Sequence, residues 1–345
     1  NPLGVLLDYD HPVSQMAERS ISLQATNLFN VSSATIGFIG AGNYASSVLV
    51  PAFARTGARL KSIASATGVS GVHVGKRNGI EEATTDAQAL INDSDINAIV
   101  ISTRHGIHAK QVCDSLAQGK HVFVEKPLVL TRDELTHIVD LYQSLTVRPL
   151  LMVGFNRRFA PHIKKIEQLL ATHSSPLSMV MTINAGHIPA DHWVHDPKMG
   201  GGRILGEACH FVDLLRFLAA SSIEKVTAIA MDAECSDSVS IQLKFKNGSI
   251  GVINYLANGS KSLPKERLEV FCNGSVLQLD NFRILRGFGW PGFKRDKLWR
   301  QDKGQFNCSR SFIDAVNSGD SSQLITFEEL VEVTQACLDT VEQIS

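Results

Sequence analysis

A glycine-rich turn between a strand-like run and a helix-like segment constrains this chain more than any other feature. Gly40 ends the apolar run and permits a sharp turn, Gly42 lets the backbone approach a pyrophosphate, and Ala45 is small enough for close helix packing. The amides at the helix start, around Asn43 and Tyr44, would face the phosphates. The pattern predicts a dinucleotide-binding turn, although glycine turns after strands are common enough that further support is needed.

Strand-like and helix-like segments alternate between residues 34 and 153. This order predicts a parallel, doubly wound Rossmann sheet. Thr131 and Glu134 have the spacing of a capping box at a helix start, and Gly79 closes another helix. The expected strands are 34–39, 60–64, 98–102, 121–124 and 150–153, and the expected helices are 47–56, 70–78, 86–92, 107–118 and 131–145.

After residue 153 the pattern changes to alternating strands joined by hairpin turns. Asn247-Gly248 and Asn273-Gly274 have the composition of two-residue hairpin loops. We therefore predict an α+β domain whose open, largely antiparallel sheet carries helices on one face. The other face would suit a homo-oligomer. The expected strands are 178–185, 226–233, 239–245, 249–255, 267–272 and 275–280, and the expected helices are 161–172, 209–218, 305–318 and 327–344.

The first residues fit neither pattern. Residues 3–9 and 21–23 are strand-like. We expect residues 1–33 to be an extension packed on the body or the end of an upstream domain. The predicted organisation is this N-terminal stretch, a dinucleotide-binding Rossmann domain at 34–153, and an α+β domain for substrate and oligomer contacts at 154–345.

Composition narrows the class of function. The 345 residues carry a formal net charge of −1, so no basic excess indicates nucleic acid, and no long uncharged apolar run indicates a membrane. The six cysteines are scattered without a C-x-x-C pair. That distribution disfavours a zinc site or a disulfide framework and fits a reducing, cytoplasmic compartment.

The end of the second predicted strand bears on the choice of dinucleotide. NAD-preferring folds usually place an acidic residue there to hold the ribose hydroxyls, and this chain has Ser65. The serine leaves room for the 2′-phosphate of NADP, with Lys76 and Arg77 as candidate contacts. Equally, backbone and hydroxyl groups could hold an unphosphorylated ribose, so NAD and NADP both stay open.

A polar segment follows the strand at 98–102. Thr103, Arg104, His105 and His108 come at the carboxyl end of that strand, where open α/β sheets bind ligands. The two histidines are candidates to line the nicotinamide half of the cofactor. Alternatively, His108 begins the next helix and His105 is a solvated loop residue.

Glu125-Lys126-Pro127 ends the next predicted strand and so reaches the same crevice. A lysine there can donate to a substrate oxygen and stabilise a developing alkoxide. Glu125 could orient the ammonium group, and Pro127 would fix the turn, with a cis bond as one way to do so. An ordinary surface turn is the alternative.

The junction of the two predicted domains carries two adjacent arginines. Arg157 and Arg158 could read an acidic group of the substrate or the cofactor. Alternatively, they form salt bridges that fix the angle between the domains, and we favour this role for at least one of them.

The segment from 186 to 213 is dense in polar and aromatic groups, which suits a sugar or polyol. Trp193 lies in its loop, and Glu207 and Asp213 are each three residues from His210 on a predicted helix. A histidine flanked by carboxylates is a natural proton acceptor, because its usual pKa lies near the working pH. A metal site is a weaker alternative without recognised ligand spacing. Its ligands would be His192, His195, Asp196 and His210.

The glycine turn, Glu125-Lys126-Pro127 and the stretch from Gly200 to Asp213 occur in the order that resembles the Gfo/Idh/MocA family. The resemblance covers residues from about 34 to the end. It implies a Rossmann domain, an α+β domain that forms oligomers through its open sheet, and NAD(P)-dependent hydride transfer at a hydroxyl-bearing carbon of a sugar, inositol or related polyol. By this resemblance Lys126 is the family's E-K-P lysine and His210 its catalytic histidine.

The chain departs from the family at one position. The aspartate expected four residues before the histidine falls on Gly206, so Glu207 could take its place or His210 could work alone. Residues 154–161 and the loop leading to 200–207 are similar to a subgroup fused behind a zinc-type alcohol dehydrogenase-like domain, and residues 3–9 are similar to the end of that upstream domain. We expect Lys126, His210 and Glu207 to be catalytic and Arg157, Trp193 and His210 to contact substrate. A non-catalytic dinucleotide-binding sensor or partner module, or reduction of an imine or ring double bond, are the alternatives.

Overall fold

The computed structural model describes residues 19–24, 34–232 and 237–345. The strand expected at 3–9 and most of the N-terminal stretch lie outside these ranges. None of the helices within them combines the length and apolar character needed to cross a bilayer.

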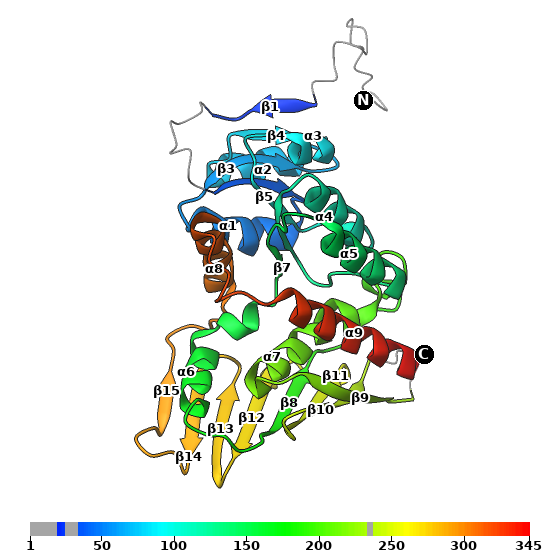
Figure 1. Ribbon diagram of the computed structural model, residues 1–345. Helices are drawn as coiled ribbons and strands as arrows, with labels where there is room; N and C mark the ends of the chain where they lie inside the picture. Colours follow the sequence, from blue (N-terminus) through cyan, green and yellow to red (C-terminus); the bar gives the residue numbers. More distant parts are fainter. Residues whose placement is uncertain (1–18, 25–33, 233–236) are drawn as a thin grey trace, which may run out of the picture.

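A seven-stranded sheet forms the upper part of the molecule in Figure 1, in the order β1-β4-β3-β2-β5-β6-β7. Every pair from β4 to β7 is parallel, which confirms the doubly wound sheet. Because the order reverses between β2 and β5, a crevice opens at their carboxyl ends beside the glycine turn. The parallel strands are β2 (Thr35–Ile39), β3 (Arg59–Ala64), β4 (Glu82–Thr84), β5 (Ala98–Ile101), β6 (His121–Val124) and β7 (Leu151–Val153).

Part of the N-terminal stretch belongs to this sheet. Strand β1 (Ser20–Ser22) pairs antiparallel with β4 at the sheet edge. The side chain of Gln24 donates to the carbonyl of Gly79 at 2.6 Å. The described residues of this stretch therefore pack on the Rossmann domain.

Two helical layers cover the first sheet. Ile36, Phe38 and Val100 point into a core under α1, α2 and α8, whereas Ile99 and Val124 point into a core under α3, α4 and α5. A single π-helical turn (Ala45–Leu49) leads into α1. The helices are α1 (Val50–Ala54), α2 (Val69–Asn78), α3 (Ala87–Asn92), α4 (His108–Ala117), α5 (Arg132–Ser144) and α8 (Gln305–Ser318).

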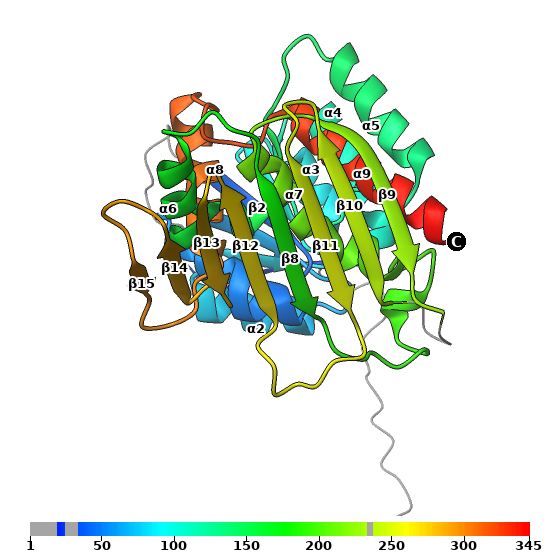
Figure 2. The ribbon, with the colours of Figure 1, turned by 90° about the horizontal axis from the view of Figure 1, so that it is seen from below.

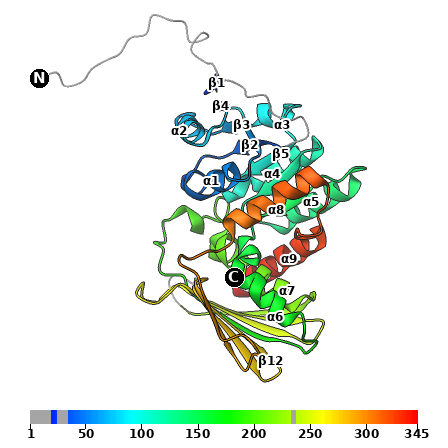
Figure 3. The same ribbon diagram turned by 90° about the vertical axis from the view of Figure 1, so that its left-hand side faces the viewer.

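The second sheet has eight strands in the order β15-β14-β13-β12-β8-β11-β10-β9. Only β8 and β11 pair in parallel, so the sheet is largely antiparallel as predicted. Helices α6 (Pro161–Leu170), α7 (Cys209–Ala219) and α9 (Phe327–Ile344) lie between this sheet and the Rossmann domain, and the opposite face is open (Figures 2 and 3). The strands are β8 (Ser178–Asn184), β9 (Ile223–Ala230), β10 (Val239–Phe245), β11 (Ile250–Leu256), β12 (Glu266–Cys272), β13 (Ser275–Asp280), β14 (Ile284–Phe288) and β15 (Arg295–Lys297).

Helix α8 crosses back to the first sheet. The ring of Phe312 packs edge-on against Phe53 and Phe123, with centroids 6.3 and 5.6 Å apart. The boundary at residue 154 thus separates the two sheets but not all of their helices. A core that includes both Ile99 and Val333 runs through both layers and holds them together.

Candidate functional site

A cleft of about 440 Å³ opens between the two sheets. Both domains supply its walls, and eight residues singled out from the sequence meet there. These are Tyr44, His105, Glu125, Lys126, Arg157, Trp193, Glu207 and His210. The other lining residues are Asn156, Ile188, Val194, Arg203, Gly206, Lys265, Lys303 and Gln305.

The glycine turn has the geometry that its sequence indicates. Gly40 adopts φ +109°, and a Cβ there would lie 2.6 Å from the carbonyl oxygen of Ser102. A Cβ on Gly42 would meet open space, which leaves room for a ligand against the backbone, and Ala45 is buried. Tyr44 begins the helical segment and is 41% exposed beside the cleft. These residues fit a bound pyrophosphate, since glycine backbone and a helix start meet at an open position.

Ser65 lies at the carboxyl end of β3, where the ribose contact was expected. It is buried, and its Oγ accepts a hydrogen bond from the amide of Gly71 at 3.1 Å. Lys76 and Arg77 belong to the last turn of α2, roughly 10 Å along the helix from its start. Residues 66–70 have no charged side chain. The turn offers neither a carboxylate for the ribose nor a nearby cation for a 2′-phosphate.

The two histidines after β5 have different environments. His105 lines the cleft, its Nδ1 lies 2.8 Å from the carbonyl oxygen of Gly200, and burial lowers its pKa to about 4. His108 is fully buried and begins α4, with Nδ1 2.7 Å from the carbonyl oxygen of Pro127. The prediction that His108 lines the cofactor site is wrong, because its ring holds the neighbouring loop. His105 is not the solvated residue of the alternative interpretation.

Lys126 extends from the end of β6 towards the second domain. Its Nζ donates to the carbonyl of Gly206 at 2.7 Å, and the Lys126–Pro127 peptide is cis. Burial raises the pKa of Glu125 to about 7, against the opposing charges of Lys126 and Arg157. Gly154 makes room for this carboxyl, since a Cβ there would be 2.8 Å from Oε1. A lysine and a poorly ionised carboxyl therefore sit side by side.

His210 faces the same cleft from the start of α7. Burial lowers its pKa well below the usual 6.5, and the positive charges of Arg157 and Lys126 lower it further. The ring packs edge-on against Phe155, with centroids 6.1 Å apart. Its buried Nδ1 has no hydrogen-bond partner among the described residues. The imidazole is therefore neutral at pH 7.

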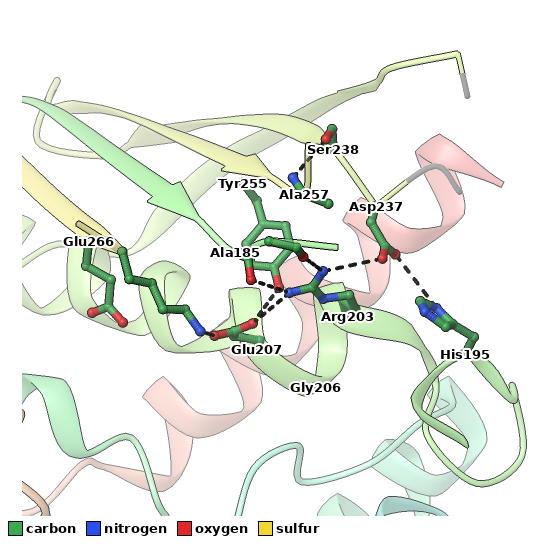
Figure 4. Close-up of polar contacts among 12 residues, drawn as sticks. Ala185, His195, Arg203, Gly206, Glu207, Asp237, Ser238, Tyr255, Ala257 and Glu266 are labelled. Carbon is green, nitrogen blue, oxygen red and sulfur yellow. Dashed lines mark hydrogen bonds and ion pairs between the residues drawn. The ribbon is translucent and has the colours of Figure 1, made fainter. Parts of the chain in front are cut away.

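The two carboxylates expected beside His210 bind other groups. Asp213 is fully buried and forms a bidentate pair with Arg158, at 2.5 and 3.1 Å. Glu207 accepts a hydrogen bond from Tyr255 at 2.5 Å (Figure 4), and it also pairs with Lys265. For Glu207 the regular helical spacing assumed from the sequence fails because residues Ile204–Ala208 form a π-helical turn, which rotates its side chain out of that register. Asp213 shares the regular helix α7 with His210, but Arg158 holds its carboxylate.

Glu207 keeps its charge at any ordinary pH. Burial would raise its pKa, but Lys265, Tyr255 and Arg203 hold the value at about 2. The guanidinium of Arg203 reaches both Glu207, at 3.4 Å, and Asp237, at 3.5 Å (Figure 4). The structure thus places Glu207 in the cleft but in an ion-pair network rather than beside the histidine.

The paired arginines at the domain junction are both engaged. Arg157 forms two hydrogen bonds with the fully buried Glu266, at 2.8 and 3.1 Å. Arg158 bridges Asp213 and Glu329. Both side chains form salt bridges, but their partners all belong to the second domain, so a role in fixing the angle between the domains stays a prediction. Arg157 also lines the cleft.

The loop from 187 to 200 reaches from the second domain to the first. Trp193 packs edge-on against His105, with ring centroids 5.1 Å apart, and the guanidinium of Arg104 lies 5.5 Å from the indole ring. The amide of Gly106 donates to the carbonyl of Met199 at 3.2 Å. The hydroxyl of Thr103 donates to Oε1 of Gln111 at 2.8 Å. The loop closes one side of the cleft over His105.

The side chains considered for a metal site do not form one. His195 lies 3.8 Å from Asp237, and Asp196 accepts hydrogen bonds from the amides of Lys198 and Met199. His192 accepts from the amide of Val194. Among residues 19–24, 34–232 and 237–345, no group of three or more His, Cys, Asp or Glu side chains is placed to hold a metal ion.

Several lining residues were not predicted. Arg203 lies in the glycine-rich stretch 200–206, and this location was the one sequence feature that could have indicated a place in the cleft. Lys265 and Lys303 lie in separate loops, and Tyr255, which donates to Glu207 but does not line the cleft, lies on β11. No local pattern connects these three residues with Glu207 or Glu266. They are joined only by the fold.

Two family models match the chain. Residues 34–155 match the model described as an oxidoreductase family with an NAD-binding Rossmann fold, and residues 165–277 match the GFO/IDH/MocA C-terminal domain. Oxidoreductase P35 of Formosa agariphila is 30% identical over 224 residues, which cover 61% of this chain and 69% of that protein. Myo-inositol 2-dehydrogenase of Thermotoga maritima is 28% identical over 215 residues, 59% of this chain and 63% of the relative. The match thus spans less than two thirds of the latter protein.

Solved structures share the fold. A levoglucosan dehydrogenase in complex with NADH and levoglucosan superposes with a TM-score of 0.77 at 20% identity, over 90% of this chain and 97% of the other. At that identity the likeness speaks for the fold of the two domains.

Proposed function

Because the chain belongs to the GFO/IDH/MocA oxidoreductase family, we propose that it transfers hydride between NAD or NADP and a hydroxyl-bearing carbon of a sugar, inositol or related polyol. One observation carries the proposal: Lys126 and His210, from different domains, line one cleft together with Tyr44 beside the glycine turn. The name of one relative, a myo-inositol 2-dehydrogenase, supports this substrate class.

His210 and Lys126 act as the acid–base pair in this proposal. Burial and the nearby cations keep the imidazole neutral, so in the oxidative direction it can accept the hydroxyl proton. The ammonium of Lys126 exchanges its hydrogen bond with the Gly206 carbonyl for one with the substrate oxygen, where it stabilises the developing charge. The bound nicotinamide supplies the hydride acceptor or donor. Reduction runs the same proton transfers in reverse.

The cofactor would rest on the first-domain wall. The glycine turn holds the pyrophosphate, and Glu125 borders the nicotinamide with its carboxyl partly protonated near pH 7. The absence of a charged side chain at 66–70 fits either dinucleotide. The proposed cofactor contacts are Gly40, Gly42, Asn43, Tyr44, Ser65, Thr103, Arg104, His105, Glu125 and Lys126.

The open face of the second sheet is the proposed oligomer contact. Phe271 and Phe288 are 43% and 52% exposed on strands of this sheet, and Ile229 is 69% exposed. Burying such side chains against a second copy would be favourable. The five described cysteines are free and buried, which fits the proposed reducing, cytoplasmic compartment. The alcohol dehydrogenase-like domain expected upstream stays a prediction.

Two measurements test the activity. Fluorescence titration with NADH and NADPH gives the affinity for each dinucleotide, and the absorbance of the reduced nicotinamide follows turnover of a panel of sugars, inositols and sugar acids. His210→Asn is expected to lower kcat by at least about 10²-fold and to change the pH–rate profile. Cofactor binding without hydride exchange on any substrate would favour the non-catalytic binding module.

A further inference from the structure

The second-domain wall of the cleft has more positive than negative side chains. Its cationic groups come from segments far apart in the sequence and face one small volume near His210. They are Arg157, Arg203, Lys265 and Lys303.

The carboxylates of this wall are shared between cations. Glu266 pairs with both Arg157, at 2.8 Å, and Lys303, at 2.7 Å. Glu207 pairs with both Lys265 and Arg203 (Figure 4). Two carboxylates therefore face four cations. Asp237, 3.5 Å from Arg203, is a third carboxylate, so the wall carries one more positive charge than negative charges.

The first-domain wall does not supply that missing charge. Lys126 donates to a neutral carbonyl, and burial raises the pKa of its neighbour Glu125 to about 7. At neutral pH this pair is therefore net positive as well. A bound oxidised nicotinamide would add a further positive charge.

The lysines present their positive ends to the cleft. The side chain of Glu266 is 0% exposed, whereas those of Lys303 and Lys265 are 17% and 41% exposed. Burial lowers the pKa of Lys303 despite its pairing with Glu266, and the charges of Arg157 and Lys265 act in the same direction as burial. An incoming molecule can reach the ammonium group of Lys303 without meeting the buried Glu266, whereas the ammonium group of Lys265 shares the cleft with its partner Glu207, whose side chain is 22% exposed.

We propose that the cleft takes a sugar or polyol that bears a carboxylate, which Lys265 and Lys303 bind while the reacting carbon lies between Lys126 and His210. The proposal deepens the function above and rests on it for the position of the reacting carbon. The excess of about one positive charge in the wall suits a monoanion. Trp193 and Ile188 supply the apolar surface on which a sugar ring can lie.

The test compares matched neutral and acidic sugars on the full chain saturated with NADH. Calorimetric titrations with glucuronate against glucose, and galacturonate against galactose, read binding without any turnover. We expect the acids to bind at least about tenfold more tightly, with the difference shrinking as salt is added.

Lysine variants then locate the site. Lys265→Met and Lys303→Met should each weaken uronate binding at least about tenfold more than they weaken neutral sugar binding, and leave NADH affinity unchanged. Lys261→Met, at an exposed lysine outside the cleft, is the matched control and should change neither.

The outcomes separate this inference from the proposed function. Equal or tighter binding of the neutral sugars, preference for a sugar phosphate over the uronate, or uronate binding that survives both lysine substitutions would overturn it. Lysine-dependent uronate binding without oxidation of any sugar would support it and count against the proposed activity. Oxidation confined to neutral sugars would support the proposed activity and contradict the inference of a carboxylate-bearing substrate.

Discussion

The two walls of the cleft are built by different means. The first-domain wall relies on the backbone: a glycine at φ +109°, an open position at Gly42 and the strand end that carries Lys126. The second-domain wall relies on side chains such as Glu207 and Glu266, each of which holds two cations. A wall made of backbone groups suits a ligand group such as a pyrophosphate, which is the same in every dinucleotide. A wall made of ion pairs can differ in charge and shape from one substrate to another.

The largest effect is expected at the point where the walls meet. Lys126→Ala removes the donor that spans the cleft, and kcat/KM should fall by about 10²–10³-fold while NADH affinity stays within a few fold. Steady-state kinetics and fluorescence titration measure the two quantities. Lys110→Ala, at a highly exposed lysine, serves as control. Wild-type turnover in Lys126→Ala would remove the lysine from the mechanism.

The backbone wall can be broken at Gly40. In Gly40→Ala the new Cβ would lie 2.6 Å from Ser102 and φ is positive, so we expect about 2–3 kcal/mol of lost stability together with weaker dinucleotide binding. Gly57→Ala is the matched control, since Gly57 has φ +84° but open space around its Cβ. Its loss should be only about 1 kcal/mol by thermal or denaturant unfolding. Equal losses would show that contact with Ser102 does not matter.

The side-chain wall can be sharpened at Glu207. Glu207→Gln keeps the shape but removes the charge shared by Lys265 and Arg203, so the free energy of unfolding should fall by about 1–2 kcal/mol. Because the pKa of Glu207 is about 2, no limb of the pH–rate profile above pH 4 should be lost. Loss of such a limb would restore Glu207 as a proton-transfer group. Tyr255→Phe, which keeps the charge, isolates the hydrogen bond.

A further effect concerns pH and the wall around His105. Its folded pKa of about 4 lies below the usual 6.5, so the unfolded chain binds the proton first. Stability that is intact above pH 6.5 is therefore lost as pH falls towards 4, by at most about 1.4 kcal/mol per pH unit. His105→Gln should flatten this slope relative to wild type, whereas His137→Gln, at an exposed position, should not. Denaturant unfolding at several pH values measures the difference.

The same contrast between the two walls explains which parts of the site could be predicted from the sequence. Gly40 and Lys126 are recognisable because a local pattern, glycine turn or strand end, fixes their place. Glu266 is 109 residues from Arg157, and no periodicity connects such a pair. Helix α8 was predicted with the right ends, yet its return to the first sheet depends on the packing of Phe312, which only the folded chain reveals.

The expected partnership of Glu207 with His210 failed for a different reason. Spacing of three residues implies neighbours only on a regular α-helix, and the chain has a π-helical turn at Ile204–Ala208. The amino-acid composition of this segment does not predict a π-helical turn. The sequence thus identified both residues as lining the site but not what each of them binds.

Gly206 of the second domain contacts two residues of the first domain, Lys126 and His105. Its carbonyl receives Lys126, and a Cβ there would lie 3.1 Å from the ring of His105. The space that the family's aspartate would need is therefore held by a side chain of the other domain. An acidic residue at 206 would crowd this ring, which has to shift by a few tenths of an ångström to admit the new side chain. Residues in direct contact couple energetically, so we expect exchanges at 206 and 105 to be non-additive across the domain boundary.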